Sequence, residues 1–155
     1  MAEQPTGKGY ELKNNDTIII SNIQTNKPTL KVMLIEGEER GKDIYELIEK
    51  IELKTVTTIP DGFCRGVETL TTLTLPPTLT EIGNEAFMGC KKLETVNFKD
   101  CDKLTKIGDK AFSGCLLLSI IVTEKSQLSF NLPPNIEEIG IEAFKLTKVP
   151  DKKEG

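Results

Sequence analysis

Two consecutive stretches of this chain decide its fold: Ile82-Gly-Asn-Glu-Ala-Phe87-Met-Gly-Cys90-Lys-Lys-Leu93 and Ile107-Gly-Asp-Lys-Ala-Phe112-Ser-Gly-Cys115-Leu-Leu-Leu118. A truncated copy of the same phrase covers 139–144, and a degenerate copy covers 59–70. The leading isoleucines stand at 59, 82, 107 and 139, so the copies are spaced by 23, 25 and 32 residues. Periods of roughly 20 to 50 residues indicate a solenoid or another repeat array.

Each copy contains two apolar segments with the spacing of short strands. The first segments cover 70–75, 93–98 and 118–123, and their last two apolar residues share one strand face. The second segments cover 79–82, 104–107 and 136–139, and proline pairs at 76–77 and 133–134 turn the chain between segments. The Ala-Phe pairs predict a short helical or 3₁₀ third side. A single unit cannot bury its apolar face, so stacked units are expected to place Phe87 over Phe112 and Cys90 over Cys115.

These units resemble the leucine-rich repeats of BspA-like surface proteins. The match is close over 75–123 and partial over 53–74 and 128–149. The resemblance implies an α/β leucine-rich repeat solenoid, mostly strand, with short helical or 3₁₀ turns and about four coils. It also implies an extracellular or surface binding protein, often an adhesin or antigen, of a bacterium or parasitic protist.

Three regions are expected along the chain: a flexible start and N-terminal strand cap over 1–42, repeats over 43–149 with an insertion near 124–131, and a charged tail over 150–155. Within the cap, 1–16 is expected to be flexible, 17–20 and 29–35 to be strands, and 36–42 to be a solvated turn. Residues 43–53 allow two interpretations. Either a helix begins at Asp43 and hands over to a strand near Ile51, or 48–53 is simply the first repeat strand. At the other end, 146–149 is expected to form a last short strand.

Composition excludes several functions. The chain has 155 residues, a net charge of −4 and no histidine, which removes Ser/His and Cys/His nucleophile pairs and histidine-ligated metals. Four cysteines without a C-x-x-C pair do not fit a zinc site, so no metal and no cofactor are expected. A basic stripe for nucleic acid and an apolar run long enough for membrane insertion are both missing from the sequence. The chain is therefore predicted not to be an enzyme.

The cysteines keep two interpretations open. Cys90 and Cys115 occupy the same repeat position, one coil apart, so they are within disulfide range if the coils stack. The favoured alternative is that each fills a tight buried corner as a small hydrophobic residue. Cys101 lies in a longer polar connection and is predicted to be exposed and to be the best candidate for a reactive thiol.

A binding surface is predicted from the residues that flank the central apolar residue of each first strand. These side chains point away from the core: Thr72, Thr74, Thr95, Asn97, Ile120 and Val122. Threonine and asparagine suit an open sheet face. Outward isoleucine and valine are unusual, so Ile120 and Val122 are expected either to lie under the 124–131 loop or to contact a partner.

The predicted function is a non-catalytic module that binds a protein or glycan on this sheet face, as a monomer. The alternative is an intracellular structural or scaffold repeat protein, or a fragment of a longer array. The resemblance implies a location at the cell surface or outside the cell. The start of the chain lacks the apolar core of a secretion signal, which leaves the cytoplasm as the other location.

Overall fold

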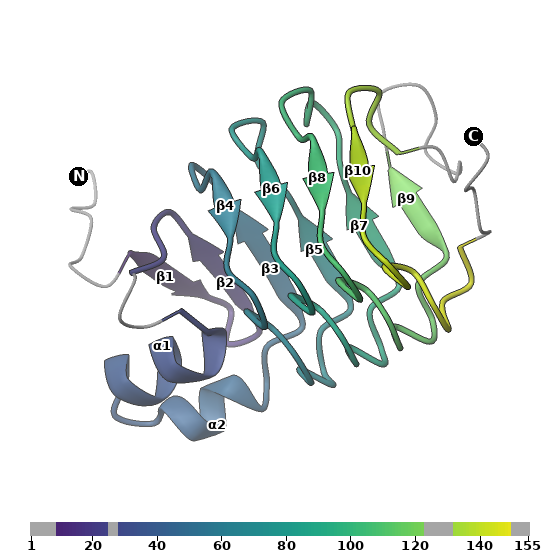
Figure 1. Ribbon diagram of the computed structural model, residues 1–155. Coiled ribbons are helices and arrows are strands. Elements are labelled where there is room, and N and C mark those ends of the chain that lie inside the picture. Colours follow the sequence, from purple (N-terminus) through teal and green to yellow (C-terminus); the bar gives the residue numbers. More distant parts are fainter. Residues whose placement is uncertain (1–8, 25–27, 123–131, 150–155) are drawn as a thin grey trace.

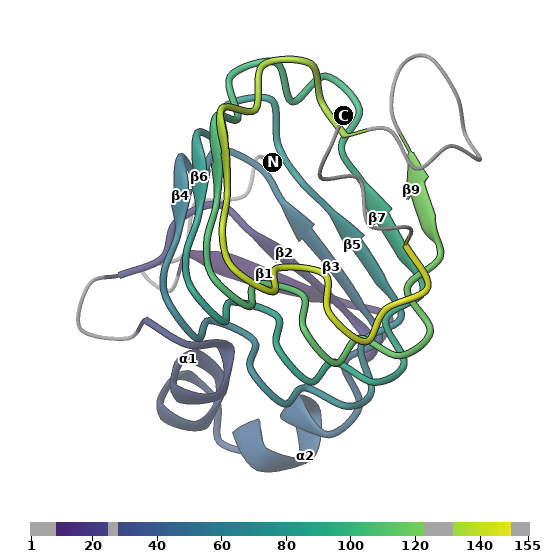
Figure 2. The same cartoon turned by 45° about the vertical axis from the view of Figure 1, so that its right-hand side comes forward.

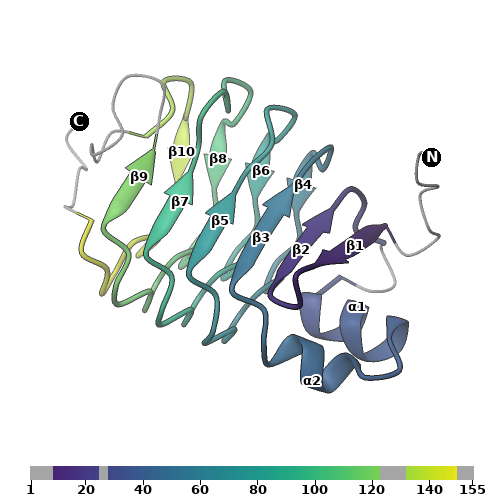
Figure 3. The same cartoon turned by 180° about the vertical axis from the view of Figure 1, so that it is seen from behind.

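A computed structural model describes residues 9–24, 28–122 and 132–149, and shows a stack of similar coils next to a helical cap (Figure 1). One face is a six-stranded sheet, seen in Figure 3, in the order β1-β2-β3-β5-β7-β9. Its strands are β1 (Tyr10–Lys13), β2 (Thr17–Ile20), β3 (Lys50–Leu53), β5 (Thr72–Thr74), β7 (Thr95–Asn97) and β9 (Ile120–Val122). The second sheet has the order β10-β8-β6-β4 and consists of β4 (Thr58–Ile59), β6 (Glu81–Ile82), β8 (Lys106–Ile107) and β10 (Glu138–Ile139).

Strand register confirms the solenoid predicted from the repeats. The strands of the second sheet pair in parallel so that the isoleucines at 59, 82, 107 and 139 stand directly beside one another. In the first sheet Leu73 pairs with Val96, and Val96 with Ile121. We name the coils one to four by the isoleucine at which each begins, from Ile59 to Ile139. Equivalent residues of successive coils therefore lie one strand spacing apart, about 4.8 Å.

The third side of each coil, expected to be helical or 3₁₀, is a run of turns in which alternate residues make the i→i−3 hydrogen bonds of a 3₁₀ helix (Figure 2). Alternate N–H groups point in different directions. The N–H groups of 86, 88 and 90 donate to the carbonyls three residues earlier, whereas those of 85, 87 and 89 donate to the carbonyls of 109, 111 and 113 in the next coil. A helix needs every N–H to bond within its own turn. Half of the N–H groups donate to the neighbouring coil, so no continuous helix forms.

A ladder of side-chain hydrogen bonds runs along one corner of the stack. Asp61 Oδ1 accepts the N–H of Asn84, and Asn84 Oδ1 accepts the N–H of Asp109, both at 2.8 Å. Asp109 Oδ1 then accepts the N–H of Ile141, also at 2.8 Å. Each short polar side chain thus satisfies a backbone donor of the following coil, and Gly83, Gly108 and Gly140 beside it leave room for the close approach.

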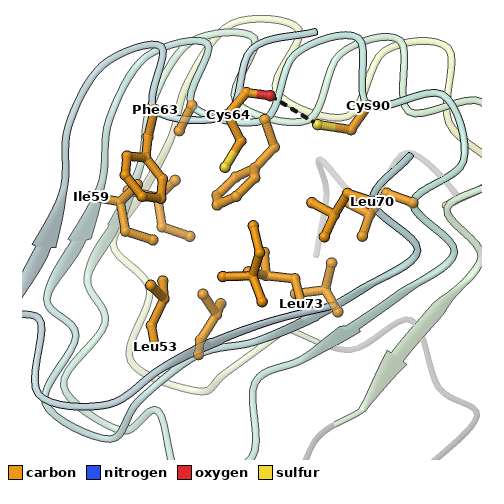
Figure 4. Close-up of a cluster of buried hydrophobic side chains, with 14 of the residues drawn as sticks. Leu53, Ile59, Phe63, Cys64, Leu70, Leu73 and Cys90 are labelled. Atoms are coloured by element: carbon orange, nitrogen blue, oxygen red, sulfur yellow. Dashed lines mark hydrogen bonds between the residues drawn. The ribbon is translucent and has the colours of Figure 1, made fainter. Parts of the chain in front are cut away.

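The core is a continuous apolar column, and Figure 4 shows the part of it around Ile59 and Leu73. The rings of Phe87 and Phe112 stack with centroids 5.3 Å apart, and Phe112 and Phe144 stack at the same distance. Coil one differs from the others. Its hydrogen bonds align Cys64, not Phe63, with Phe87, so Phe63-Cys64 replaces Ala-Phe and exchanges the positions of the small and the large side chain.

The N-terminal cap corrects one prediction. Residues 29–35, expected to be a strand, form instead the N-cap (Thr29) and most of helix α1 (Leu30–Gly37). The side chain of Thr29 caps the helix by accepting the N–H of Val32, and Leu30, Met33 and Leu34 are buried along one face. The N–H of Leu30 donates to the carbonyl of Phe63, which attaches the helix to coil one. The β-branched residues suggested a strand, but capping and helical apolar spacing prevail.

Other parts of the cap were predicted in part. The strand at 17–20 is confirmed as β2, whereas 10–13 within the expected flexible start pairs with it as β1. The turn expected at 36–42 holds the end of α1 and the start of a short helix, α2 (Gly41–Tyr45). Of the two interpretations of 43–53, the structure matches the helix followed by a strand, but the helix begins at Gly41 and not at Asp43. The strand is β3, which joins the repeat sheet in register.

Two expectations concern the other end of the stack. Residues 146–149, expected to be a strand, form a bend, and the N–H of Lys148 donates to the carbonyl of Leu118. Leu146 has a positive φ of 63°, a conformation that interrupts an extended strand. The insertion at 124–131 and the tail at 150–155 lie outside the described residues.

Candidate binding surface on the six-stranded sheet

Strand register aligns two parallel rows of outward positions on the outer face of the six-stranded sheet. Strand register aligns the first row as Lys13, Thr17, Lys50, Thr72, Thr95 and Ile120. The second row is Glu11, Ile19, Glu52, Thr74, Asn97 and Val122. The predicted residues on β5, β7 and β9 thus share one face, as successive outward positions of parallel strands must.

The middle of this face is small and polar. Thr72, Thr74, Thr95 and Asn97 are half-buried, and the residues between them, Leu73 and Val96, are fully buried beneath the sheet. The Oδ1 atom of Asn97 accepts the N–H of Lys99 at 2.8 Å, which fixes the orientation of its side-chain amide. The core is formed by the opposite side of these strands. Substitutions on the outer face therefore change the surface without removing core contacts.

Sequence reasoning missed the continuation of this face toward the cap. Lys50 and Glu52 of β3 extend the threonine rows, and Glu52 lies 3.8 Å from Lys54 in an exposed ion pair. Glu11, Lys13 and Ile19 complete the rows on β1 and β2. Residues 9–16 are polar and rich in glycine and asparagine, so a flexible segment was expected where β1 forms. Alternation in Glu11-Leu-Lys13 was the signal that could have found it.

At the opposite end of the face, β9 places Ile120 beside Thr95 and Val122 beside Asn97. The backbone thus brings all six predicted residues onto one surface. The side chains of β9 and the 124–131 loop are not among the described residues, so the choice between loop cover and partner contact stays a prediction.

The thiols are all internal. Cys101, predicted to be exposed, is buried, because its Sγ turns inward toward the carbonyl of Pro76, at 3.5 Å. Burial, and then the nearby carboxylates of Asp100 and Asp102, raise the pKa of Cys101 to about 12. Cys90 and Cys115 are free thiols, and their Sγ atoms donate to the carbonyls of Cys64 and Phe87 at 3.1 Å. The adjoining Cys115 thiol and burial raise the pKa of Cys90 well above its usual value.

Within the described ranges, no group of three or more acidic or thiol side chains is arranged to hold a metal ion. Of the helices in the same ranges, none combines the length and the apolar character needed to cross a bilayer.

Solved structures with the same architecture come from several bacteria. A leucine-rich repeat protein from Bacteroides ovatus is 25% identical, with a TM-score of 0.55, and the match covers 89% of this chain. The chain spans only 31% of the length of that protein. A leucine-rich repeat protein of T. pallidum is 22% identical, with a TM-score of 0.52, and the match covers 96% of this chain and 69% of that one. The pneumococcal vaccine antigen PcpA is 22% identical, with a TM-score of 0.50 over 64% of this chain and 28% of its own.

Among curated proteins, no sequence match was found. The model of the BspA type leucine rich repeat region matches residues 45–151 with six copies. That span covers more than half of the chain and includes β3 and all four coils. The chain therefore belongs to the BspA-type leucine-rich repeat family.

Proposed function

We propose that this chain is a non-catalytic binding module whose partner docks on the outer face of the six-stranded sheet. The observation that supports this most directly is the small polar centre formed by Thr72, Thr74, Thr95 and Asn97 on a regular parallel sheet. Small side chains allow a partner to approach the sheet closely, and hydroxyl and amide groups supply donors and acceptors. Repeat solenoids present extended surfaces of this kind.

The other two sides of the coil are less suited to a partner. On the second sheet each strand has two residues, and the outward Glu81 lies 3.9 Å from Lys106 of the next coil. On the turn side Arg65 pairs with Glu85 at 3.0 Å. Side chains that pair across coils must give up these contacts before they contact a partner. On the threonine face the described contacts of Thr72, Asn97 and Glu52 join residues one or two apart in the sequence. A partner that docks there breaks no contact between these coils, which favours this face as the site.

A protein partner fits this face better than a glycan. Sugar rings are commonly held by stacking on exposed aromatic rings, whereas the two outer rows contain only aliphatic, hydroxyl, amide and charged side chains. The charged end at Lys50 and Glu52 adds groups that can pair with a protein surface. A location at the cell surface is part of the proposal and is supported by the family resemblance of the repeats.

The test is a binding assay of the immobilised chain against extracts of extracellular matrix and of cell surfaces. Thr72→Arg and Thr95→Arg place a long charged side chain in the same row and should reduce capture at least about tenfold, the equivalent of about 1.4 kcal/mol. Glu138→Arg on the second sheet is the matched control and should leave capture unchanged. Circular dichroism should be the same for all three variants.

Capture that survives both threonine substitutions would refute the sheet face as the site. Capture by no extract would favour the structural or scaffold role instead.

A further inference from the structure

Two buried thiols lie side by side on the turn side of coils two and three. Cys90 and Cys115 each follow a glycine of positive φ, and each donates its N–H to the carbonyl three residues earlier. A Cβ atom built on Gly114 would lie 3.5 Å from the Cα atom of Gly89, so the two coils are in close contact next to the thiols. The Cα atoms of the two cysteines are therefore about 4.8 Å apart, one strand spacing. That separation lies within the range of about 4.4–6.8 Å that disulfides need.

The two thiols also have the same orientation. The Sγ atom of Cys90 donates to the carbonyl of Cys64 at 3.1 Å. The Sγ atom of Cys115 donates to the carbonyl of Phe87, also at 3.1 Å. Because Cys64 and Phe87 are equivalent positions, the two sulfur atoms stand about one coil apart. A thiol is a weak hydrogen-bond donor, so each side chain loses little when it rotates away from its carbonyl toward the other sulfur.

Each of these two thiols has one suitable partner. The same repeat position holds Val67 in coil one and Thr147 in coil four, so its sulfur atoms are confined to coils two and three. Cys64 belongs to a different position of its coil. Figure 4 shows its Sγ atom pointing into the apolar column, whereas the Sγ atom of Cys90 points to the Cys64 carbonyl. Cys101 lies on the connection between β7 and β8, outside the turn side.

We propose that Cys90 and Cys115 form a reversible disulfide between coils two and three when a small-molecule disulfide, such as oxidised glutathione, acts on the folded protein. The thiolate of one cysteine attacks a sulfur of the reagent, whose S–S bond breaks and releases one glutathione thiolate. The thiolate of the other cysteine then attacks the protein sulfur of this mixed disulfide, forms the bond between the coils and releases the second glutathione. The two cysteines lose two electrons and two protons, and the reagent takes up both to become two glutathione thiols.

Burial determines how this reaction proceeds. Both side chains are fully buried, so the reagent reaches them only when the turn side opens locally, and oxidation is slower than that of an exposed thiol. The finished bond closes the loop that contains β7 and β8, which restricts the unfolded chain. The oxidised protein should therefore melt at a higher temperature than the reduced protein, by roughly 5–15 °C.

Peptide mapping by mass spectrometry tests the proposal. The folded 155-residue chain is incubated with excess oxidised glutathione in the absence of oxygen, and the remaining thiols are blocked with N-ethylmaleimide under denaturing conditions. Trypsin then places the four cysteines in separate peptides, because a lysine or arginine separates each from the next. The expected product is a single disulfide between the peptides of Cys90 and Cys115, which dithiothreitol cleaves. Cys64 and Cys101 should carry the maleimide.

Two variants complete the test. Cys115→Val places in coil three the residue that coil one has at 67, so it should fold with unchanged circular dichroism. It should form no disulfide within the chain and show no rise in melting temperature with the oxidant. Cys101→Ser is the matched control and should oxidise as the wild type does. The map of the wild-type protein is decisive even if Cys115→Val does not fold.

Three results of the mapping would overturn the proposal. The first is that both thiols stay reduced in the folded protein, and the second is that Cys90 is linked to Cys64 instead. The third is that the bond between Cys90 and Cys115 forms only after the chain is unfolded in urea. A melting temperature that does not rise on oxidation would also overturn it, because the bond would then not fit the spacing of the stacked coils.

Discussion

Removing the central ring of the phenylalanine column should separate coil four from the rest of the stack. Phe112 is fully buried and stacks on Phe87 and on Phe144, both with centroids 5.3 Å apart. Phe112→Ala leaves a cavity in the column and removes both ring contacts. The neighbouring coils then share less apolar surface, although the backbone ladder between them remains.

The expected cost follows from this geometry. Truncation of a buried phenylalanine to alanine costs about 3–5 kcal/mol. Each aromatic pair contributes about 0.5–1.5 kcal/mol beyond its buried area, and Phe112 takes part in two. The upper part of the range is therefore expected, about 4–5 kcal/mol. At about 2–4 °C per kcal/mol for a chain of this size, the melting temperature should fall by roughly 8–20 °C.

Urea unfolding followed by circular dichroism measures the loss, and Leu117→Ala, an exposed leucine of the same coil, is the control with an expected change below about 0.5 kcal/mol. Hydrogen exchange measures where the loss occurs. In a repeat protein the stability of a coil depends on its neighbours, so amides of coil four should lose protection first while those of β1, β2 and α1 keep theirs. A cost below about 1 kcal/mol, or an equal loss of protection along the whole chain, would refute the stacked column as the element that couples the coils.

Three further changes follow from single contacts. Asn84→Ala removes the acceptor for the N–H of Asp109 and should cost about 0.5–1.5 kcal/mol in urea unfolding, while Asn84→Asp, which keeps the acceptor, should cost less than half as much. Gly108→Ala would place a Cβ atom 2.7 Å from the backbone N of Asn84, so it should destabilise the fold by about 1–3 kcal/mol; an unchanged midpoint would contradict the close approach. Because burial raises the pKa of Cys101 from its ordinary value near 9 to about 12, its neutral thiol favours the folded state below pH 9, and this contribution is lost between pH 9 and 12. Urea unfolding across that range should show a smaller decline for Cys101→Ser than for the wild type.

The repeats could be predicted from the sequence because residues that recur in the sequence pack beside one another in successive coils. An isoleucine that recurs every 23 to 25 residues can be buried by its equivalents only if the coils stack. Ile82 and Ile107 therefore predict both a strand and the strand that pairs with it. The inward and outward residues of β5 and β7 followed from the two-residue period of a strand. The same period predicted that Thr72, Thr74, Thr95 and Asn97 share the outer face of the sheet, and their role in binding stays a prediction.

The cap could not be predicted in the same way, because it occurs once and has no repeated pattern to average. Residues 30–35 mix the β-branched Val32 and Ile35 with helix-forming leucine, lysine and methionine, so propensity alone does not decide. The cap at Thr29 and the burial of Leu30, Met33 and Leu34 on one face show the helix. The prediction that Cys101 is exposed was wrong for a related reason. Its flanking aspartates indicated solvent, but the turn directs the thiol toward Pro76 while the carboxylates stay outside.

Each coil assigns separate tasks to its surfaces, and this bears on the proposed function. Leu73 and Phe112 point inward and are fully buried, whereas Thr72 points outward and is half-buried. Partner binding on the sheet face and the stability of the stack should therefore respond to different substitutions. Thr72→Arg should weaken capture and leave the free energy of unfolding within about 0.5 kcal/mol of the wild type, whereas Phe112→Ala should lower that free energy. If Thr72→Arg lowered capture and stability together, the loss of capture would report unfolding and not the loss of a binding site.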